Sequence, residues 1–132
     1  MNIQEIFDTV SVHLLTQNEK SQESSFYSSC LYRGPNGLKC AVGCLIKDEF
    51  YNIHIENYSS DAECVIKALG QSGIIIDDEI TEILYDLQDI HDTCWACNWH
   101  KLLYLLALDY DLSPDILTQF GDISEYEKIS DL

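Results

Sequence analysis

Positive charge is scarce in this chain. Its 132 residues include 7 Lys and Arg against 23 Asp and Glu, which gives a formal net charge of −16. The imbalance is steepest after residue 76, where 14 acidic residues accompany 2 basic ones. Such a surface would repel a phosphate backbone, so we expect no direct nucleic-acid binding. It would attract a protein with a basic surface and accelerate the encounter at low salt.

Long hydrophobic runs are also missing. No stretch approaches the roughly 20 apolar residues that a membrane-spanning helix needs, so we expect no membrane insertion. The segment 1–6 lacks the basic region and apolar stretch of a secretory signal, and we therefore expect a cytoplasmic protein. Thiols stay reduced in that compartment, so the six cysteines favour free, mostly buried side chains over disulfides.

Apolar residues are nonetheless plentiful, at 46% of the chain, and are sufficient for one domain with a single core. We predict a globular domain over 1–121, followed by an acidic tail over 122–132. The predicted fold class is α+β and mostly helical, with about four to five helices packed around a small β-hairpin of two strands or, as the alternative, three.

Capping signals and apolar spacing predict the helices. Asn2 and Glu5 fit a capping box for a first helix that ends near Asn18. Asp77 opens the clearest helix, in which one apolar face runs from Ile80 to His91. Further helix starts are Ser60 with Glu63, Asn98, and Ser113 followed by Pro114.

The segment 30–46 predicts the hairpin. Two short apolar runs flank a turn over 34–37, whose sequence Gly-Pro-Asn-Gly suits a type I turn followed by a left-handed residue. We expect residues 30–33 to pair with residues 38–41. Residues 50–58 alternate well enough to form a third strand, or they form a loop anchored by aromatic side chains.

Five residues are candidates for binding a ligand or partner. Arg33 stands beside the turn with Tyr32 before it and Lys39 nearby, in a chain where cations are rare. Arginine recognises carboxylates and phosphates bidentately, although Arg33 could equally neutralise the protein's own acidic helices. His91 and Asp92 form a polar pair at the end of the helix that Asp77 opens, where the helix dipole alone is sufficient reason for a histidine.

The cysteines and histidines raise two chemical alternatives. The ligand types His91, Cys94, Cys97 and His100 suit zinc, but three-residue steps on one helix spread the side chains, so the set converges only if the helix breaks there. Cys40 would be an activated nucleophile if a helix began at it, whereas burial is the structural alternative. We therefore expect no catalytic residue, metal or cofactor.

The block Cys30-x-Tyr-Arg-Gly-Pro-x-Gly-Leu-Lys-Cys-Ala-Val-Gly-Cys-Leu-Ile46, with Asp48-Glu49-x-Tyr51 and 87–92 (Leu-Gln-Asp-Ile-His-Asp), resembles a group of small proteins encoded by tailed phages and prophages. The resemblance extends over roughly residues 3–112. It implies a phage product in the host bacterial cytoplasm, where small acidic proteins often bind host or defence machinery. The Cys94 and Cys97 pair and the acidic tail depart from that group.

Three functional hypotheses follow. The first is a non-enzymatic phage accessory protein that binds a host protein, possibly of a defence system, through an acidic surface. The second is sequestration of a small anionic ligand, such as a nucleotide signal, by Tyr32, Arg33 and Lys39. The third is a cysteine-based enzyme or zinc-binding protein.

Overall fold

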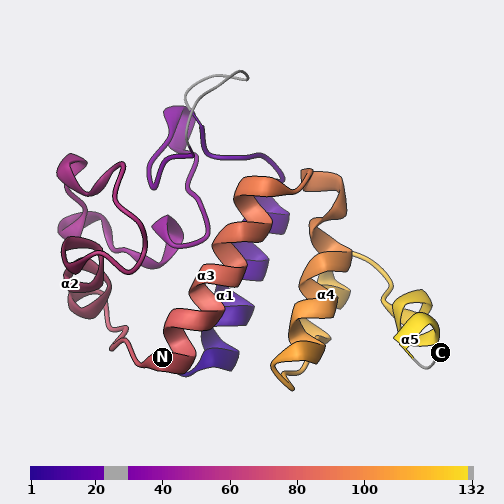
Figure 1. The fold of residues 1–132 in the computed structure, drawn as a ribbon. Helices are drawn as coiled ribbons and strands as arrows, with labels where there is room; N and C mark the ends of the chain where they lie inside the picture. Colours follow the sequence, from indigo (N-terminus) through magenta and orange to yellow (C-terminus); the bar gives the residue numbers. More distant parts are fainter. Residues whose placement is uncertain (23–29, 131–132) are drawn as a thin grey trace.

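Helices provide the regular structure. The computed structural model describes residues 1–22 and 30–130, and over these residues it contains five α-helices: α1 (Ile3–Gln17), α2 (Glu63–Gln71), α3 (Asp78–Thr93), α4 (Trp99–Asp109) and α5 (Ser124–Ser130) (Figure 1). Short 3₁₀ helices span Pro35–Gly37, Gly43–Leu45, Asp48–Phe50, Ile53–Ile55, Ala96–Asn98 and Asp115–Gln119. Of the helices described, none has the length and apolar character needed to cross a membrane.

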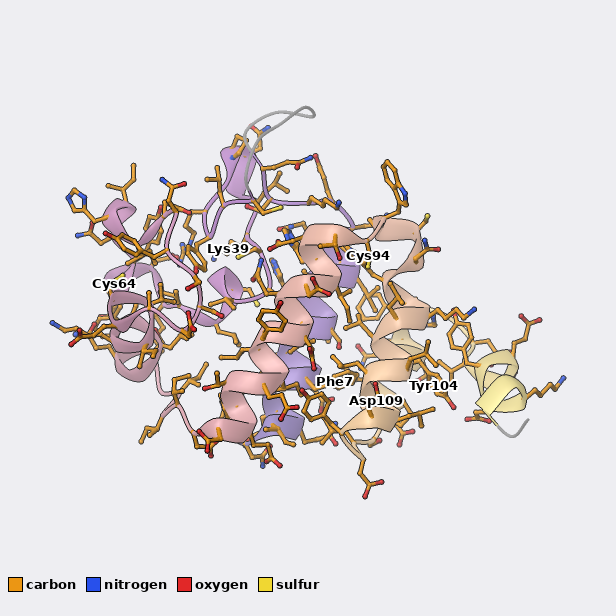
Figure 2. All side chains as sticks on the ribbon, viewed as in Figure 1. Phe7, Lys39, Cys64, Cys94, Tyr104 and Asp109 are labelled. Atoms are coloured by element: carbon orange, nitrogen blue, oxygen red, sulfur yellow. The ribbon has the colours of Figure 1, made fainter. Side chains whose placement is uncertain are left out.

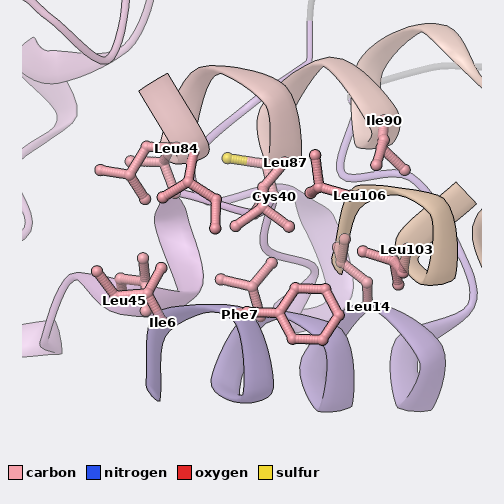
Figure 3. Packing of buried hydrophobic residues seen from close by; sticks show 14 of the residues in the cluster. Ile6, Phe7, Leu14, Cys40, Leu45, Leu84, Leu87, Ile90, Leu103 and Leu106 are labelled. Atoms are coloured by element: carbon pink, nitrogen blue, oxygen red, sulfur yellow. The ribbon is translucent and has the colours of Figure 1, made fainter. Parts of the chain in front are cut away.

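The core lies where α1, α3 and α4 pack against one another. Phe7 and Leu14 of α1 face Leu87 of α3 and Leu103 of α4 across this interface, and all four side chains are fully buried (Figure 3). The 3₁₀ turn Gly43–Leu45 also packs on α1. The predicted single core is therefore built mainly from three helices.

Two predicted helix starts are confirmed in detail. The Asn2 side chain accepts a hydrogen bond from the Glu5 amide at 2.8 Å, and the Glu5 carboxylate accepts one from the Asn2 amide at 3.1 Å, completing the capping box of α1. The Asp77 carboxylate accepts from the Ile80 amide at 2.8 Å and caps α3. The predicted apolar face of α3, which ends at His91, is buried.

The other starts differ from the prediction. Ser60 does not cap α2, because this helix begins after Ala62 with no capping side chain. Asn98 precedes α4 but makes no capping hydrogen bond through its side chain. Beyond Pro114 the chain forms a 3₁₀ helix rather than an α-helix.

The predicted β-hairpin is wrong. The turn forms, and the Gly34 amide donates to the Leu38 carbonyl at 2.7 Å, but the only described pairing across it is one isolated bridge between Arg33 and Lys39. Residues 30–31 instead turn to the segment before them, where the Leu31 amide donates to the Ser21 carbonyl at 2.7 Å. The fold is therefore all-helical over the described residues.

Hydrogen bonds from side chains to the backbone explain why strand pairing does not extend beyond this single bridge. Glu56 accepts hydrogen bonds from the backbone amides of Tyr32 and Arg33, at 2.9 and 3.1 Å. The Lys39 amide donates to the Gln17 side chain at 2.9 Å, and the Lys39 carbonyl accepts from the same side chain. Backbone groups satisfied in this way have no need of a strand partner. Of the two alternatives for residues 50–58, the third strand is wrong, because 3₁₀ turns at Asp48–Phe50 and Ile53–Ile55 occupy that segment.

The last part of the chain contacts the domain. Ile123 is buried, and Tyr126 of α5 lies against the rings of His100 and Tyr104. The predicted division at residue 121 stays a prediction, but the segment just after it is partly anchored.

Candidate functional site

A pocket of about 470 Å³ opens between one face of α3 and the loop over residues 57–60. We call it the α3 pocket. Cys30, Tyr32 and Cys40 contribute to its lining from the segment 30–40. The remaining lining residues are Asn57, Tyr58, Ser59 and Ser60 of the loop, and Tyr85, Gln88, Asp89, Asp92 and Thr93 of α3.

Helix periodicity explains the α3 wall. Spacings of four and three residues place Tyr85, Asp89 and Asp92 on the same side of the helix, in successive turns. Leu84 and Leu87 lie on the other side and are buried in the core. Packing of the apolar face thus fixes which polar side chains reach the pocket.

His91 and Asp92 form a hydrogen-bonded pair beside the pocket. The His91 ring is fully buried, and its Nε2 accepts a hydrogen bond from the Ser21 amide at 3.0 Å. An acceptor nitrogen has a free lone pair, so the ring proton is on Nδ1, which lies 2.7 Å from Asp92 Oδ1 and donates to it. Gln88 also donates to Asp92 Oδ1, at 2.7 Å, and accepts from the Val42 amide.

Cys30 completes the one group of potential metal ligands in the described parts of the chain. Donor atoms of Cys30, His91 and Asp92 lie within 4.8 Å of one another. The Ser21 amide argues against a metal there, because its hydrogen bond to Nε2 keeps the ring proton on Nδ1, the His91 nitrogen that lies against Asp92. Burial and then the adjacent Asp92 carboxylate raise the pKa of the Cys30 thiol to about 12, which disfavours the thiolate that metals and electrophiles require.

The predicted cationic candidates lie elsewhere. The Arg33 guanidinium pairs with Asp48, donates to the Ile46 carbonyl at 2.6 Å and lies over the Tyr51 ring, 4.9 Å from its centroid. The Lys39 ammonium is 3.7 Å from the same Asp48 carboxylate. The hydrogen bond from Arg33, and then the positive charge of Arg33, hold the pKa of Asp48 below its usual range. These cations neutralise the protein's own carboxylate.

Two of the predicted candidates, Tyr32 and Asp92, line the same α3 pocket. The Tyr32 hydroxyl donates to the Tyr58 carbonyl, so the ring of Tyr32 is held against the loop on the opposite wall. Of the five candidates predicted from the sequence, the structure therefore groups Tyr32, His91 and Asp92, and separates Arg33 and Lys39 from them.

The four zinc candidates do not converge. The two nitrogens of His100 lie 2.9 Å from the Leu117 carbonyl and 3.0 Å from the Tyr126 hydroxyl. Cys94 is half-buried and Cys97 is exposed at the junction of α3 and α4. Cys40, the candidate nucleophile, is almost fully buried, and burial raises the pKa of its thiol.

A second hollow, of about 580 Å³, is lined almost wholly by acids. Tyr110 is its one residue without a carboxyl group, and its hydroxyl donates to Asp86 at 2.6 Å. Burial, this bond and neighbouring carboxylates raise the pKa of Tyr110. We define the acidic face as Asp78, Glu79, Glu82 and Asp86 of α3 with Asp109 and Asp111 at the end of α4.

The acidic face is not neutralised from within. Within the described residues, none of its six carboxylates has a Lys, Arg or His partner within 4.0 Å, because the ion pairs found there join Asp48 to Arg33 and Lys39, and Asp92 to His91. Asp109 marks its α4 side in Figure 2.

Sequence reasoning missed Tyr58, Tyr85 and Asp89. The spacing of Tyr85, Asp89 and Asp92 opposite an apolar stripe was a usable signal for the α3 wall. Nothing in the sequence placed residues 57–60 against it.

No family model, curated protein or solved structure matches this chain.

Proposed function

We propose that this chain is a non-enzymatic phage accessory protein that binds a host protein with a basic surface through the acidic face. The observation that carries the proposal is the set of six carboxylates, four from α3 and two from the end of α4 and the turn after it, with no internal cation paired to them in the described residues. Like charges held together are unfavourable in the free protein, and a basic partner would relieve their repulsion.

The phage assignment and the host cytoplasm rest on the resemblance of the block over 30–46. Protein binding rests on charge and position. The acidic face lies at one end of the helical core, where α3 begins and α4 ends, so it offers a rigid set of charges from regular helices.

The two alternatives have less support. An anionic ligand would find Arg33 and Lys39 already paired with Asp48, and the described residues that line the α3 pocket include no Lys or Arg. A cysteine enzyme needs an accessible thiolate, whereas burial raises the thiol pKa of Cys30 and Cys44 to about 12.

The test is capture of partners from bacterial lysate by the immobilised chain and by a variant in which Glu79, Glu82 and Asp109 are changed to the corresponding amides. The matched control neutralises the exposed acids Glu19, Glu49 and Glu125, so that net charge is equal in both variants. We expect a selective partner that the acidic-face variant loses and the control variant keeps. Equal capture by both variants, or no selective partner, contradicts the proposal.

A further inference from the structure

The α3 pocket combines negative charge with aromatic rings. Asp89 and Asp92 lie on its α3 wall, while Tyr32, Tyr58 and Tyr85 also line it. The faces of tyrosine rings carry partial negative charge, and they attract a guanidinium or ammonium group that approaches within about 6 Å. Carboxylates beside such rings add charge-assisted hydrogen bonds.

The carboxylate of Asp89 is available for a ligand. The Asp89 side chain is exposed, and its carboxylate makes no hydrogen bond or ion pair with any other residue of the segments 1–22 and 30–130. Asp92, in contrast, is held by His91 and Gln88 and is oriented by them. One acid is thus fixed and the other is unengaged, on the same face of one helix.

A lysine of this chain already uses similar chemistry next to the pocket. The Lys20 ammonium donates to the Asp92 carbonyl at 3.2 Å and lies 5.8 Å from the centroid of the Trp95 ring. Lys20 does not belong to the pocket lining. The Lys20 ammonium therefore lies at the end of the α3 wall, and within residues 1–22 and 30–130 Asp89 has no ion pair with it or with another cation.

Size and charge narrow the ligand class. A volume of about 470 Å³ falls in the range of pockets that hold organic groups, about 300–1,000 Å³, and far exceeds a bare ion. An anion would face two carboxylates. A metal would need the His91 nitrogen that donates to Asp92.

We propose that the α3 pocket binds a guanidinium group, supplied by an arginine side chain of the partner protein. The Asp89 and Asp92 carboxylates receive its N–H donors, and the rings of Tyr58 and Tyr85 flank it. This inference rests on the proposed function, since it gives the basic partner one anchoring residue in a pocket separate from the acidic face.

The test titrates the isolated protein with N-acetyl-arginine methylamide and follows backbone amide NMR shifts. The neutral isostere N-acetyl-citrulline methylamide is the ligand control, and spermidine probes free amines as the alternative source. We expect millimolar binding of the arginine derivative, as one side chain without its protein context provides. Shift changes should concentrate at residues 57–60 and 85–92, and citrulline should cause none.

Variants sharpen the result. Asp89→Asn should weaken binding about fivefold and Tyr85→Ala about threefold, the sizes expected for a partly exposed charge and one aromatic ring. Glu125→Gln, at an exposed acid outside both the pocket and the acidic face, should change affinity less than about twofold. Both pocket positions are exposed, so the variants should fold normally.

Three results would overturn the inference: equal binding of the citrulline derivative, equal weakening by Glu125→Gln and Asp89→Asn, or tighter binding of spermidine than of the arginine derivative. Because the probes are small molecules, such a failure is separate from the lysate experiment. Partner capture through the acidic face could succeed while the pocket stays empty of arginine.

Discussion

His13 is a half-buried residue of α1 whose Nε2 donates to the Lys39 carbonyl, with 2.8 Å between the two atoms. Burial lowers its pKa below 6.5, and the bond to Lys39 opposes this only in part. A lowered pKa means that the unfolded chain binds the proton more readily. Stability from this group is therefore complete above about pH 6.5 and is lost as the pH falls towards the folded-state pKa.

We expect the urea concentration at the unfolding midpoint to decrease as the pH is lowered from 7.5 to 5.5. Ordinary carboxylates titrate below this range. His13→Gln keeps a donor for the Lys39 carbonyl but removes the titration, so its midpoint should change less over the same range. An unchanged pH dependence in this variant would show that another group is responsible.

The cysteines differ in expected reactivity. Burial raises the thiol pKa of Cys30 and Cys44 to about 12, and raises that of Cys40 as well, whereas Cys97 is exposed. We expect iodoacetamide at pH 8 to modify Cys97 at least about tenfold faster than these three, because the thiolate is the reactive form. Mass spectrometry of peptides measures this order. Fastest labelling at Cys30 or Cys40 would revive the cysteine-enzyme hypothesis.

At the scale of elements, the segment 30–46 is held by side chains from other elements. Glu56 accepts from two backbone amides and also from the Tyr51 hydroxyl at 2.7 Å. Glutamine has one acceptor oxygen, so Glu56→Gln should leave a backbone amide poorly satisfied and lower the free energy of unfolding by about 1–3 kcal/mol. Glu49→Gln, at an exposed acid, is the control for charge. Equal urea midpoints for the two variants would contradict this role.

Gly43 lies where the backbone of the same segment passes close to the backbone of Tyr32. A Cβ built at Gly43 would lie 2.1 Å from the Tyr32 carbonyl oxygen, so the backbone would have to move. We expect Gly43→Ala to destabilise the protein by about 2–4 kcal/mol. At Gly70, inside α2, a Cβ would meet nothing within 4 Å, and Gly70→Ala should stabilise by up to about 1 kcal/mol. Thermal unfolding distinguishes the two, and equal effects would contradict the packing argument.

The whole molecule carries a net charge of −16, so its parts repel one another in the folded state. Raising NaCl from about 0.01 to 0.1 M shortens the screening length from about 30 to 10 Å. We expect Tm to rise by about 4 °C, which corresponds to about 1 kcal/mol for a domain of this size. The variant with Glu79, Glu82 and Asp109 neutralised should show a smaller rise. A salt-independent Tm would mean that repulsion contributes little.

Sequence patterns identified much of this architecture. The capping box of Asn2 and Glu5, the Asp77 cap and the apolar face of α3 are local features, and each occurs as predicted. The β-hairpin failed for a non-local reason. Glu56 and Gln17 lie 23 and 22 residues from the amides that they bind, at Arg33 and Lys39, and no turn signal at residues 34–37 reveals them.

The candidate site shows the same division. The sequence singled out Tyr32, His91 and Asp92, but as parts of separate features, and it could not exclude Arg33 and Lys39. Only the packed chain brings Asp48 to those two cations and residues 57–60 to the wall of α3.

The sequence by itself determined where α1 and α3 begin, which face of α3 is apolar and how large the excess of negative charge is, because capping, spacing and composition act over neighbouring residues. Tertiary structure alone decided which backbone amides received side-chain acceptors and which carboxylates kept no cation. Those outcomes depend on distances between segments far apart in the chain, such as Glu56 to Arg33 and Gln17 to Lys39, which only the folded chain brings together.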